Sequence, residues 1–389
     1  MIRNISIGID VGSSTTRVVV GEFLKGEKNP KIIGIGEIET KGIRHGYVVN
    51  FNDAVDSVKK AVAIAEKTSN IKIKRAFVSI GGTTLHSETS SGIAIISKAD
   101  GEVTRLDINK ALEDGENNLK LGNRKVIQMF PISFRLDGKE VLGKPDGMRG
   151  VKLEIKTLFV TCSSQHLEDM LEVINEAGVE PIGIVAAPIA GSYIALSDKQ
   201  KIVGSALVNI GSETVSIGVF ENGSLISLQT YSIGSSDITN DIALGLRIPL
   251  ERAEGFKLGN ISEEYPKKKL DEIIDARLSD IFELIENHLK KVKRNELLPA
   301  GIVWIGGGSL IAKLEELSRS ALKLPSRIGQ TEMFSNTKTK LRDPSWFTVL
   351  GLITENKDKN GPYPPKGSFS NILNEIKNGI KLMTKQLMP

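Results

Sequence analysis

The chain has 389 residues, enough for two or three domains, and its 40% hydrophobic and 25% charged residues are typical of globular proteins. A formal net charge of +4, from 51 basic and 47 acidic residues, gives no argument for nucleic acid binding. The one cysteine, Cys162, excludes a disulfide framework and is predicted to be buried, and the four histidines lack the spacing of zinc ligands. Without a signal pattern or a long apolar run, we expect a cytoplasmic or peripheral protein.

Hydrophobic patterns near the N-terminus predict three short strands, a helix and a fourth strand. The strands are expected at residues 5–11, 16–23 and 32–39, the helix at 51–67 and the fourth strand at 75–80. This order is the core unit of a ribonuclease-H-like sheet.

Residues 83–157 interrupt that pattern and are predicted to form an inserted domain. We expect strands at 92–96, 125–135 and 152–159, a helix at 106–121, and a loop at 137–149 that is dense in glycine, proline and charge. A helix at 165–177 and a strand at 182–186 then lead to a short helix that ends near residue 197.

The strand pattern of the first unit recurs after residue 201, with Gly223 in a hairpin turn, which predicts an internal duplication. Three helices are expected next, at residues 236–246, 250–258 and 266–293. A strand and glycine loop at 302–308 are expected to open a helical run through residue 322. Residues 356–367 combine turn formers and charges without an apolar face, which indicates a flexible linker.

These patterns divide the chain into segments with different predicted roles. The division is 1–82 and 158–198 for the first half, 83–157 for the inserted domain, 199–235, 236–298 and 299–344 for the second half, 345–355 for a return to the first half, 356–367 for the linker, and 368–389 for a C-terminal amphipathic helix.

Three glycine-containing turns, far apart in the chain, carry the functional prediction. They contain Asp10, Gly12, Ser13, Ser14 and Thr15; then Asn209, Gly211, Ser212, Glu213 and Thr214; then Gly306, Gly307 and Gly308. Glycines let backbone N–H groups crowd a phosphate, hydroxyls add donors, and an acidic residue can serve Mg²⁺. One such turn alone is more often an ordinary hairpin. Three in this order predict two turns that clamp a triphosphate across a cleft and a loop that holds adenosine.

These turns resemble the two phosphate motifs and the adenosine motif of the actin, sugar-kinase and heat-shock-chaperone ATPase fold. Within that fold the chain is similar to the FtsA family of bacterial division proteins, most sharply between residues 237 and 254. There, Asp-Ile-Thr-Asn-Asp-Ile-Ala is followed by Leu-Arg-Ile-Pro-Leu-Glu-Arg-Ala-Glu. The resemblance covers nearly all of the chain. It implies an actin-like α/β fold, with two ribonuclease-H-like halves around a nucleotide cleft and an inserted α+β domain.

The resemblance also implies ATP and Mg²⁺ as cofactors. The first turn would wrap the β- and γ-phosphates, with Asp10 near Mg²⁺ through water, and the second turn would wrap the other side. Glu254 and Lys257, one helical turn apart, would reach the ribose, although such a pair is usually an exposed ion pair. The remaining implied nucleotide-binding residues are Asp241, Gly307 and Gly308.

Two departures from the family pattern predict ATP binding with weak or absent turnover. Asn209 stands where this fold usually has an aspartate, and an amide lacks the charge that holds hydrated Mg²⁺. Residues 186–188 offer no carboxylate or glutamine to position an attacking water. No catalytic residue is assigned, and Asp10, Asn209 and Glu213 remain candidates. Whether Glu213 compensates for Asn209 stays open.

The C-terminal stretch is predicted to be a membrane-binding helix. Its apolar residues recur at helical spacing and its lysines lie off that stripe; they are Phe369, Ile372, Leu373, Ile376, Ile380, Met383 and Leu387, with Lys377, Lys381 and Lys385. Such a helix suits an anionic lipid surface, although it could also dock on its own protein. One helix binds weakly, so attachment would require several protomers side by side.

The resemblance implies three further kinds of partner: the FtsZ tail, other copies of the chain, and division proteins that meet the inserted domain. Candidate residues for the FtsZ tail are Asn287, Lys290, Lys291 and Arg294. We therefore expect a self-associating, ATP-binding adaptor that tethers FtsZ to the cytoplasmic membrane at the division site. The alternatives are a PilM-like pilus assembly protein and a small-molecule kinase, the latter disfavoured because no base for an acceptor hydroxyl is evident.

Overall fold

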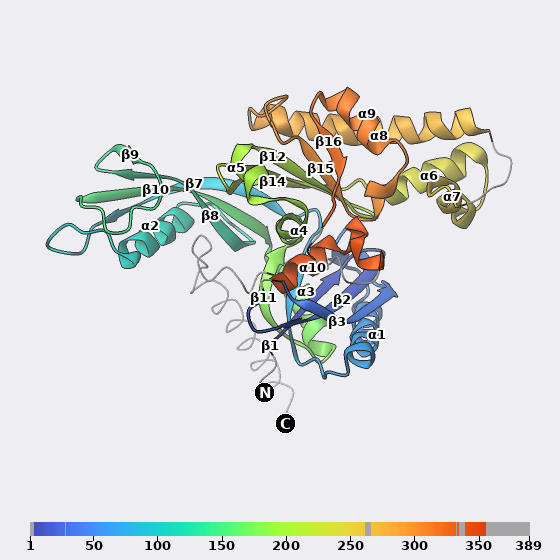
Figure 1. The fold of residues 1–389 in the computed structure, drawn as a ribbon, viewed down its shortest axis with the longest axis horizontal. Coiled ribbons are helices and arrows are strands. Elements are labelled where there is room, and N and C mark those ends of the chain that lie inside the picture. The colour runs from blue at the N-terminus through green and yellow to red at the C-terminus, as the bar shows by residue number, and fades with distance from the viewer. Residues whose placement is uncertain (1–3, 28, 261–265, 332, 334–338, 355–389) are drawn as a thin grey trace.

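The computed structural model describes residues 4–27, 29–260, 266–331, 333 and 339–354. The predicted linker and C-terminal helix therefore lie outside the described residues. Figure 1 shows the first half below a long sheet, with the inserted region projecting to one side and helices α6 (Ser235–Leu246) and α7 (Leu250–Lys257) on the other. Among the helices of the described residues, none combines the length and apolar composition needed to span a bilayer.

The first half is built on a sheet with the strand order β11-β6-β1-β2-β3. Its strands are β1 (Asn4–Val11), β2 (Thr15–Phe23), β3 (Lys31–Glu39), β6 (Arg75–Ile80) and β11 (Glu180–Ala186). Strand β2 pairs antiparallel with both β1 and β3. Strand β6 runs parallel to β1, and β11 runs parallel to β6. Helix α1 (Phe51–Ser69) covers β2 and β3, and the Asn50 side chain caps its first turn by accepting from Asp53 N–H. The predicted strand and helix order is confirmed.

The second half repeats this topology. Its strand order is β16-β15-β12-β13-β14, with β12 antiparallel to β13 and parallel to β15, which confirms the predicted duplication. These strands are β12 (Ser205–Ile210), β13 (Val215–Glu221), β14 (Ser224–Tyr231), β15 (Ile302–Ile305) and β16 (Ser326–Ile328). Helices α8 (Lys267–Lys291) and α9 (Leu314–Leu322) lie on one face of this sheet, and α4 (Ala187–Ala195) lies on the other (Figure 1).

The inserted region extends the sheet of the second half. Its elements are β7 (His86–Ile95), α2 (Arg105–Asn117), β8 (Arg124–Leu136), β9 (Lys139–Val141) and β10 (Lys152–Ser163). Strand β7 meets β14 at a single residue pair, His86 with Gln229, and the Ser87 hydroxyl accepts from the Leu228 N–H at 2.7 Å. One sheet of nine strands therefore runs through both regions in the described residues.

The two halves share a core beneath the long sheet. Helix α10 (Phe347–Thr354) packs against β1 and β2 of the first half and crosses α4, which itself contacts β12 and β13. Short helices precede it at Thr339–Arg342 and Pro344–Trp346, and α3 (Ser164–Glu176) lies beside β11. Cys162 is fully buried, as predicted, and burial raises the pKa of its thiol to about 12.

Local structure differs from the prediction in several places. The glycine loop does not open one continuous helix: a 3₁₀ turn (Gly307–Leu310) is separated from α9 by Lys313, whose φ of 62° cannot continue a right-handed helix. The strand pattern of the second unit was expected from residue 201, but helix α5 (Asp198–Val203) lies there and the first strand begins at Ser205. A two-residue hairpin, β4 (Ile43–Arg44) with β5 (Tyr47–Val48), was not predicted.

Candidate functional site

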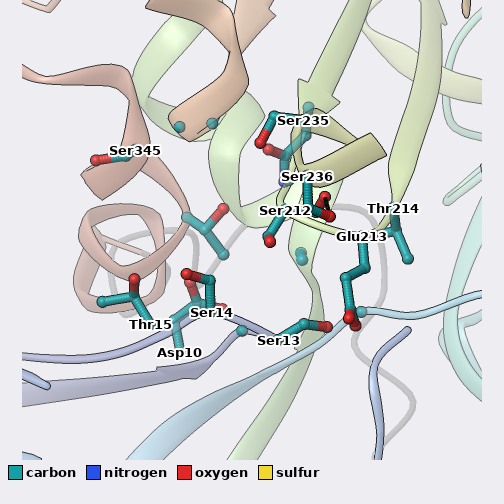
Figure 2. A pocket seen from close by; sticks show the side chains of 18 of the residues that line it. Asp10, Ser13, Ser14, Thr15, Ser212, Glu213, Thr214, Ser235, Ser236 and Ser345 are labelled. Atoms are coloured by element: carbon teal, nitrogen blue, oxygen red, sulfur yellow. Dashed lines mark hydrogen bonds between the residues drawn. The ribbon is translucent and has the colours of Figure 1, made fainter. Parts of the chain in front are cut away.

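A cavity of about 590 Å³ lies between the two halves, where the three glycine-containing turns converge. Figure 2 shows Asp10, Ser13, Ser14 and Thr15 on one side and Ser212, Glu213, Ser235 and Ser236 opposite them. The predicted site residues that line this cavity are Asp10, Gly12, Ser13, Ser14, Thr15, Asn209, Gly211, Ser212, Glu213, Thr214, Glu254, Lys257 and Gly307. Residues up to about 300 positions apart in the sequence therefore meet at one site.

The two phosphate-type turns have the same local construction. Gly12 N–H donates to the Thr15 carbonyl at 3.2 Å, and Gly211 N–H donates to the Thr214 carbonyl at 2.8 Å. Each bond closes a tight turn between antiparallel strands, β1 with β2 and β12 with β13. The second turn is also held by the start of α6, because Ser236 donates to the Ser212 carbonyl from its N–H at 2.8 Å and from its hydroxyl at 2.6 Å. Both turns are thus fixed before any ligand arrives.

Asp10 lies at the end of β1, below the first turn. Burial raises the pKa of its carboxyl, while a hydrogen bond from the Ser79 hydroxyl at 2.5 Å and the nearby Arg17 guanidinium act in the opposite direction. Arg17 is paired with Asp10 across β1 and β2, and its Nε donates to Glu37 at 3.0 Å. The two strands that flank the first turn therefore present one carboxylate and one cation to the cavity.

Glu254 and Lys257 form a partly buried polar group on α7. Lys257 Nζ lies 2.7 Å from Glu254 Oε2, 2.8 Å from Thr239 Oγ1 and 3.1 Å from the Ser235 carbonyl. The lysine side chain is 3% exposed and that of the glutamate is 44% exposed, so the alternative of a freely exposed ion pair is wrong. Burial lowers the pKa of Lys257, and its bond with Glu254 opposes that effect. Glu254 is left facing the cavity with its orientation fixed.

The third turn brings its backbone close to the end of β12, just before the second turn. Gly306 has a φ of +88°, and a Cβ added there would stand 2.2 Å from Asn209 Oδ1, so only glycine fits. A Cβ at Gly307 would meet no atom within 4 Å, because this residue faces the cavity. Gly308 is buried behind it, where a Cβ would stand 2.3 Å from Ile210 Cγ2. Of Gly307 and Gly308, the two glycines of this turn that the resemblance assigns to the nucleotide, Gly307 alone lines the cavity.

Other predicted residues lie away from the cavity. Asp241 pairs with Arg277 of α8 at 2.7 Å. It does not line the cavity where the other predicted nucleotide-binding residues meet. Lys290 pairs with Glu286, and Arg294 pairs with Glu221. The residues predicted for the membrane, from Phe369 to Met383, are outside the described part of the chain.

Sequence reasoning missed several cavity residues because they belong to none of the three turns. They are Arg17, Gly46, Gly81, Gly82, Met170, Ser235, Ser236, Leu310, Asp343 and Ser345. The glycine pair after β6 was visible as a strand end, but nothing in the sequence connected it with the first turn. Ser345 follows the Asp343 cap of a short helix, and Gly306 N–H donates to the intervening Pro344 carbonyl at 3.2 Å.

The electrostatics of the cavity limit its chemistry. In the described residues its lining carboxylates are Asp10, Glu213, Glu254 and Asp343, and its lining cations are Arg17 and Lys257. Ala187 lines the cavity without a polar side chain. Within the described part of the chain, no group of three or more histidine, cysteine or acidic side chains could hold a metal ion by itself.

Comparison with known proteins agrees with this architecture. The family described as cell division protein FtsA matches residues 206–351, and the SHS2 domain inserted in FtsA matches residues 82–161. FtsA of Bacillus subtilis is 28% identical over 369 residues, which cover 89% of this chain and 82% of the relative.

Two solved structures share the fold at low sequence identity. A PilM–PilN type IV pilus biogenesis complex aligns with a TM-score of 0.68 at 15% identity, over 90% of this chain and 97% of the other. An MreB of Spiroplasma citri bound to ADP aligns with a TM-score of 0.52 at 13% identity, over 92% and 99%. These likenesses confirm the predicted actin-like fold. The two family matches together cover more than half of the sequence, and the chain belongs to the FtsA family of cell division proteins.

Proposed function

We propose that this chain is an ATP-binding adaptor of cell division, which self-associates and tethers FtsZ filaments to the cytoplasmic face of the membrane. The observation that carries the nucleotide part is the convergence of both phosphate-type turns and Gly307 on one cavity of about 590 Å³. The FtsA family membership carries the division role. A structural neighbour, MreB of Spiroplasma citri, was solved with ADP, which supports a nucleotide as the ligand of this fold.

The cavity residues fit an adenine nucleotide. Backbone N–H groups of the two turns and the hydroxyls of Ser13, Ser14 and Thr15 would donate to phosphate oxygens. Glu254, held by Lys257, would accept from ribose hydroxyls. The open space above Gly307 would receive the adenine ring. The two turns are closed by their own backbone hydrogen bonds, and Glu254 is held by Lys257 and Thr239.

Asp10 fits a role near Mg²⁺. This ion binds proteins through one or two carboxylates, together with water and substrate phosphates. Asp10 supplies a carboxylate below the first turn, and its orientation is set by the Ser79 hydroxyl. Bound there, the ion would supply charge neutralisation to the phosphates.

Weak or absent turnover follows from the rest of the lining. Positioning and electrostatics supply nearly all of the catalysis in phosphoryl transfer. Asn209 is neutral, Ala187 has no polar group, and Glu254 is bonded to Lys257. We therefore propose that the nucleotide acts mainly as a structural switch between the halves.

The proposed partner surfaces are assigned as follows. On α8, Asn287, Lys290 and Lys291 are exposed and would receive the FtsZ tail, while Arg294 is already paired with Glu221. The inserted region would meet other division proteins, and residues 368–389 would bind anionic lipid. Filament formation would place many such weak membrane contacts side by side.

Two measurements test the proposal. Fluorescent ATP carrying an N-methylanthraniloyl label should bind the full chain, and unlabelled ATP should displace it. On anionic vesicles with ATP, the full chain should float, whereas a truncation ending at Gly367 should stay in solution, and FtsZ should float only with the full chain. Absence of ATP binding, or equal flotation of both proteins, would contradict the corresponding part.

The PilM-like alternative has one observation in its favour, the TM-score of 0.68 with the PilM–PilN complex. At 15% identity that likeness concerns the fold alone. A PilM-like protein would bind a membrane-protein tail and would not need a lipid-binding helix, so the flotation result separates the two functions. Consumption of ATP that depends on a small-molecule acceptor would instead point to a kinase.

A further inference from the structure

The hairpin formed by β4 and β5 ends in a turn that lies between the two phosphate-type turns. Its two central residues, His45 and Gly46, have positive φ angles of 49° and 88°. This combination is typical of a two-residue hairpin turn, but histidine in the left-handed region is uncommon and costs energy. Tertiary contacts must therefore stabilise the turn.

The strongest of those contacts cross to the second half. His45 N–H donates to Glu213 Oε2 at 2.6 Å, and His45 Nδ1 lies 3.0 Å from the Glu213 carbonyl oxygen. Because a carbonyl oxygen only accepts, Nδ1 carries the proton in this contact. Arg44 Nε adds an ion pair with Glu213 Oε1 at 3.4 Å. Both carboxylate oxygens of Glu213 are thus engaged by residues of the opposite half.

The same turn is anchored firmly to its own half. Gly46 N–H donates to the Ser13 hydroxyl at 3.2 Å, and Thr83 N–H donates to the His45 carbonyl at 3.3 Å. A Cβ added at Gly46 would stand 2.4 Å from Gly82 Cα, so the turn rests directly on the backbone after β6. It therefore cannot follow the second half if the halves move apart.

We propose that Arg44, His45, Gly46 and Glu213 form a clasp that holds the two halves together and slows the release of bound nucleotide. This inference rests on the nucleotide binding proposed above. It assigns the Glu213 side chain to cleft closure, and leaves its backbone N–H for phosphate. His45 and Glu213 are positioning residues in this scheme, since neither is required to contact the nucleotide through its side chain.

The contacts of the clasp differ in how strongly they stabilise the association of the two halves. The Glu213 side chain is 17% exposed, so its bond with the His45 N–H is shielded from water. A hydrogen bond to a charged group of this kind is worth about tenfold or more in an equilibrium. The Arg44 side chain is 68% exposed, and an exposed ion pair contributes much less. We therefore expect the Glu213 carboxylate to dominate. The His45 ring should contribute less, through its contact with the Glu213 carbonyl, because the His45 N–H belongs to the backbone and is kept in any substitution of that residue.

The test uses the full chain with labelled ATP and labelled ADP, and measures release after a chase with unlabelled nucleotide. Glu213→Ala removes the carboxylate, His45→Gly removes the ring while keeping a residue that tolerates positive φ, and Arg44→Ala removes the exposed pair. Glu140→Ala, an exposed glutamate on β9, is the matched control. Hydrogen exchange of residues 43–48 in the nucleotide-free protein reports on the clasp directly.

We expect Glu213→Ala to release both nucleotides about tenfold faster, His45→Gly severalfold faster, and Arg44→Ala and Glu140→Ala at close to the wild-type rate. Residues 43–48 should exchange faster in Glu213→Ala. His45 does not line the cavity in the described residues, so a direct role of Glu213 alone would leave His45→Gly unchanged, which would overturn the proposal. An effect of Glu213→Ala on ATP but not on ADP, or unchanged exchange, would also overturn it.

Failure of the nucleotide proposal would look different. If the wild-type chain binds neither labelled nucleotide, the proposed ATP site is wrong whatever the variants do. Faster exchange of residues 43–48 in Glu213→Ala would then still support the clasp as a link between the halves, and unchanged exchange would remove it.

Discussion

Gly351 of α10 lies directly against Ala190 of α4. A methyl carbon added at Gly351 would stand 1.8 Å from the Ala190 carbonyl oxygen, much closer than two non-bonded heavy atoms can approach. Helix α10 packs on the sheet of the first half, and α4 contacts the sheet of the second. The halves are therefore joined beneath the cavity by a helix crossing that only a glycine allows.

Gly351→Ala should destabilise the protein because the two helices must separate to accept the methyl group. Overpacking of a tight core usually lowers the free energy of unfolding by about 1–3 kcal/mol. Because the added methyl group meets backbone atoms of Ala190, which cannot turn aside as a side chain can, we expect a loss at or above the upper end of that range. Urea denaturation would measure the free energy of unfolding. Gly81→Ala is the control, because its Cβ would meet its nearest neighbour at an ordinary 3.8 Å. Equal stability of the two variants would contradict the crossing described here.

Gly307 and Gly308 are adjacent but should respond to substitution in different ways. Gly307→Phe places a ring in the open space proposed for adenine, so labelled ATP should bind at least about tenfold more weakly while unfolding changes little. Gly308→Ala drives a methyl group against Ile210 and Ser235, so it should lower the free energy of unfolding by about 1–3 kcal/mol. Fluorescence titration and urea denaturation of both variants separate the two effects. Loss of stability in Gly307→Phe without loss of binding would contradict the assignment.

Local patterns were sufficient to predict most of the first half. Helix α1 was predictable because Ala54, Val58 and Ala65 repeat with the helical period, and all are buried in the structure. Strand β7 was predicted to begin at residue 92 but begins at His86, since its polar first half is stabilised by pairing with β10. Sequence period alone does not report such pairing.

Long-range contacts set the limits of prediction at the site. Glu213 was expected to serve the nucleotide, but its side chain contacts His45, 168 residues away, in a hairpin whose two-residue strands are too short to show a periodic pattern. Asp241 was assigned by motif, whereas Arg277 of α8, two helices later, pairs with it. The two phosphate-type turns were predictable because glycine and hydroxyl residues between strands constrain the local backbone.

His288 should make stability depend on pH between about 6.5 and 4. It is buried on α8 and bonded to the Ser227 hydroxyl at 2.9 Å, and burial, helped by Lys291, lowers its pKa from the ordinary 6.5 to about 4. In this window the unfolded chain binds a proton that the folded chain does not. The free energy of unfolding should therefore fall as pH drops through it, by about 3 kcal/mol, and the contribution should level off below pH 4.

The measurement is urea denaturation at several pH values between 7 and 4. His288→Gln should flatten the pH dependence relative to the wild type, and the remaining slope should include His166, whose pKa burial also lowers. Asn287→Ala, an exposed change on the same helix, should keep the wild-type slope. An unaltered slope in His288→Gln would show that this histidine is not buried in its neutral form.

Replacing Asn209 by aspartate should make nucleotide binding more dependent on Mg²⁺. Asn209 lines the same cavity as Asp10, so the variant adds a second carboxylate near the proposed phosphates. Without the metal, that charge repels the nucleotide; with it, the charge attracts the ion. The ratio of Kd values for labelled ATP without and with Mg²⁺ should rise by about tenfold, a change of about 1.4 kcal/mol. Asn222→Asp makes the same charge change in an exposed turn and should leave the ratio unaltered. An unaltered ratio in Asn209→Asp would place the metal elsewhere in the cavity.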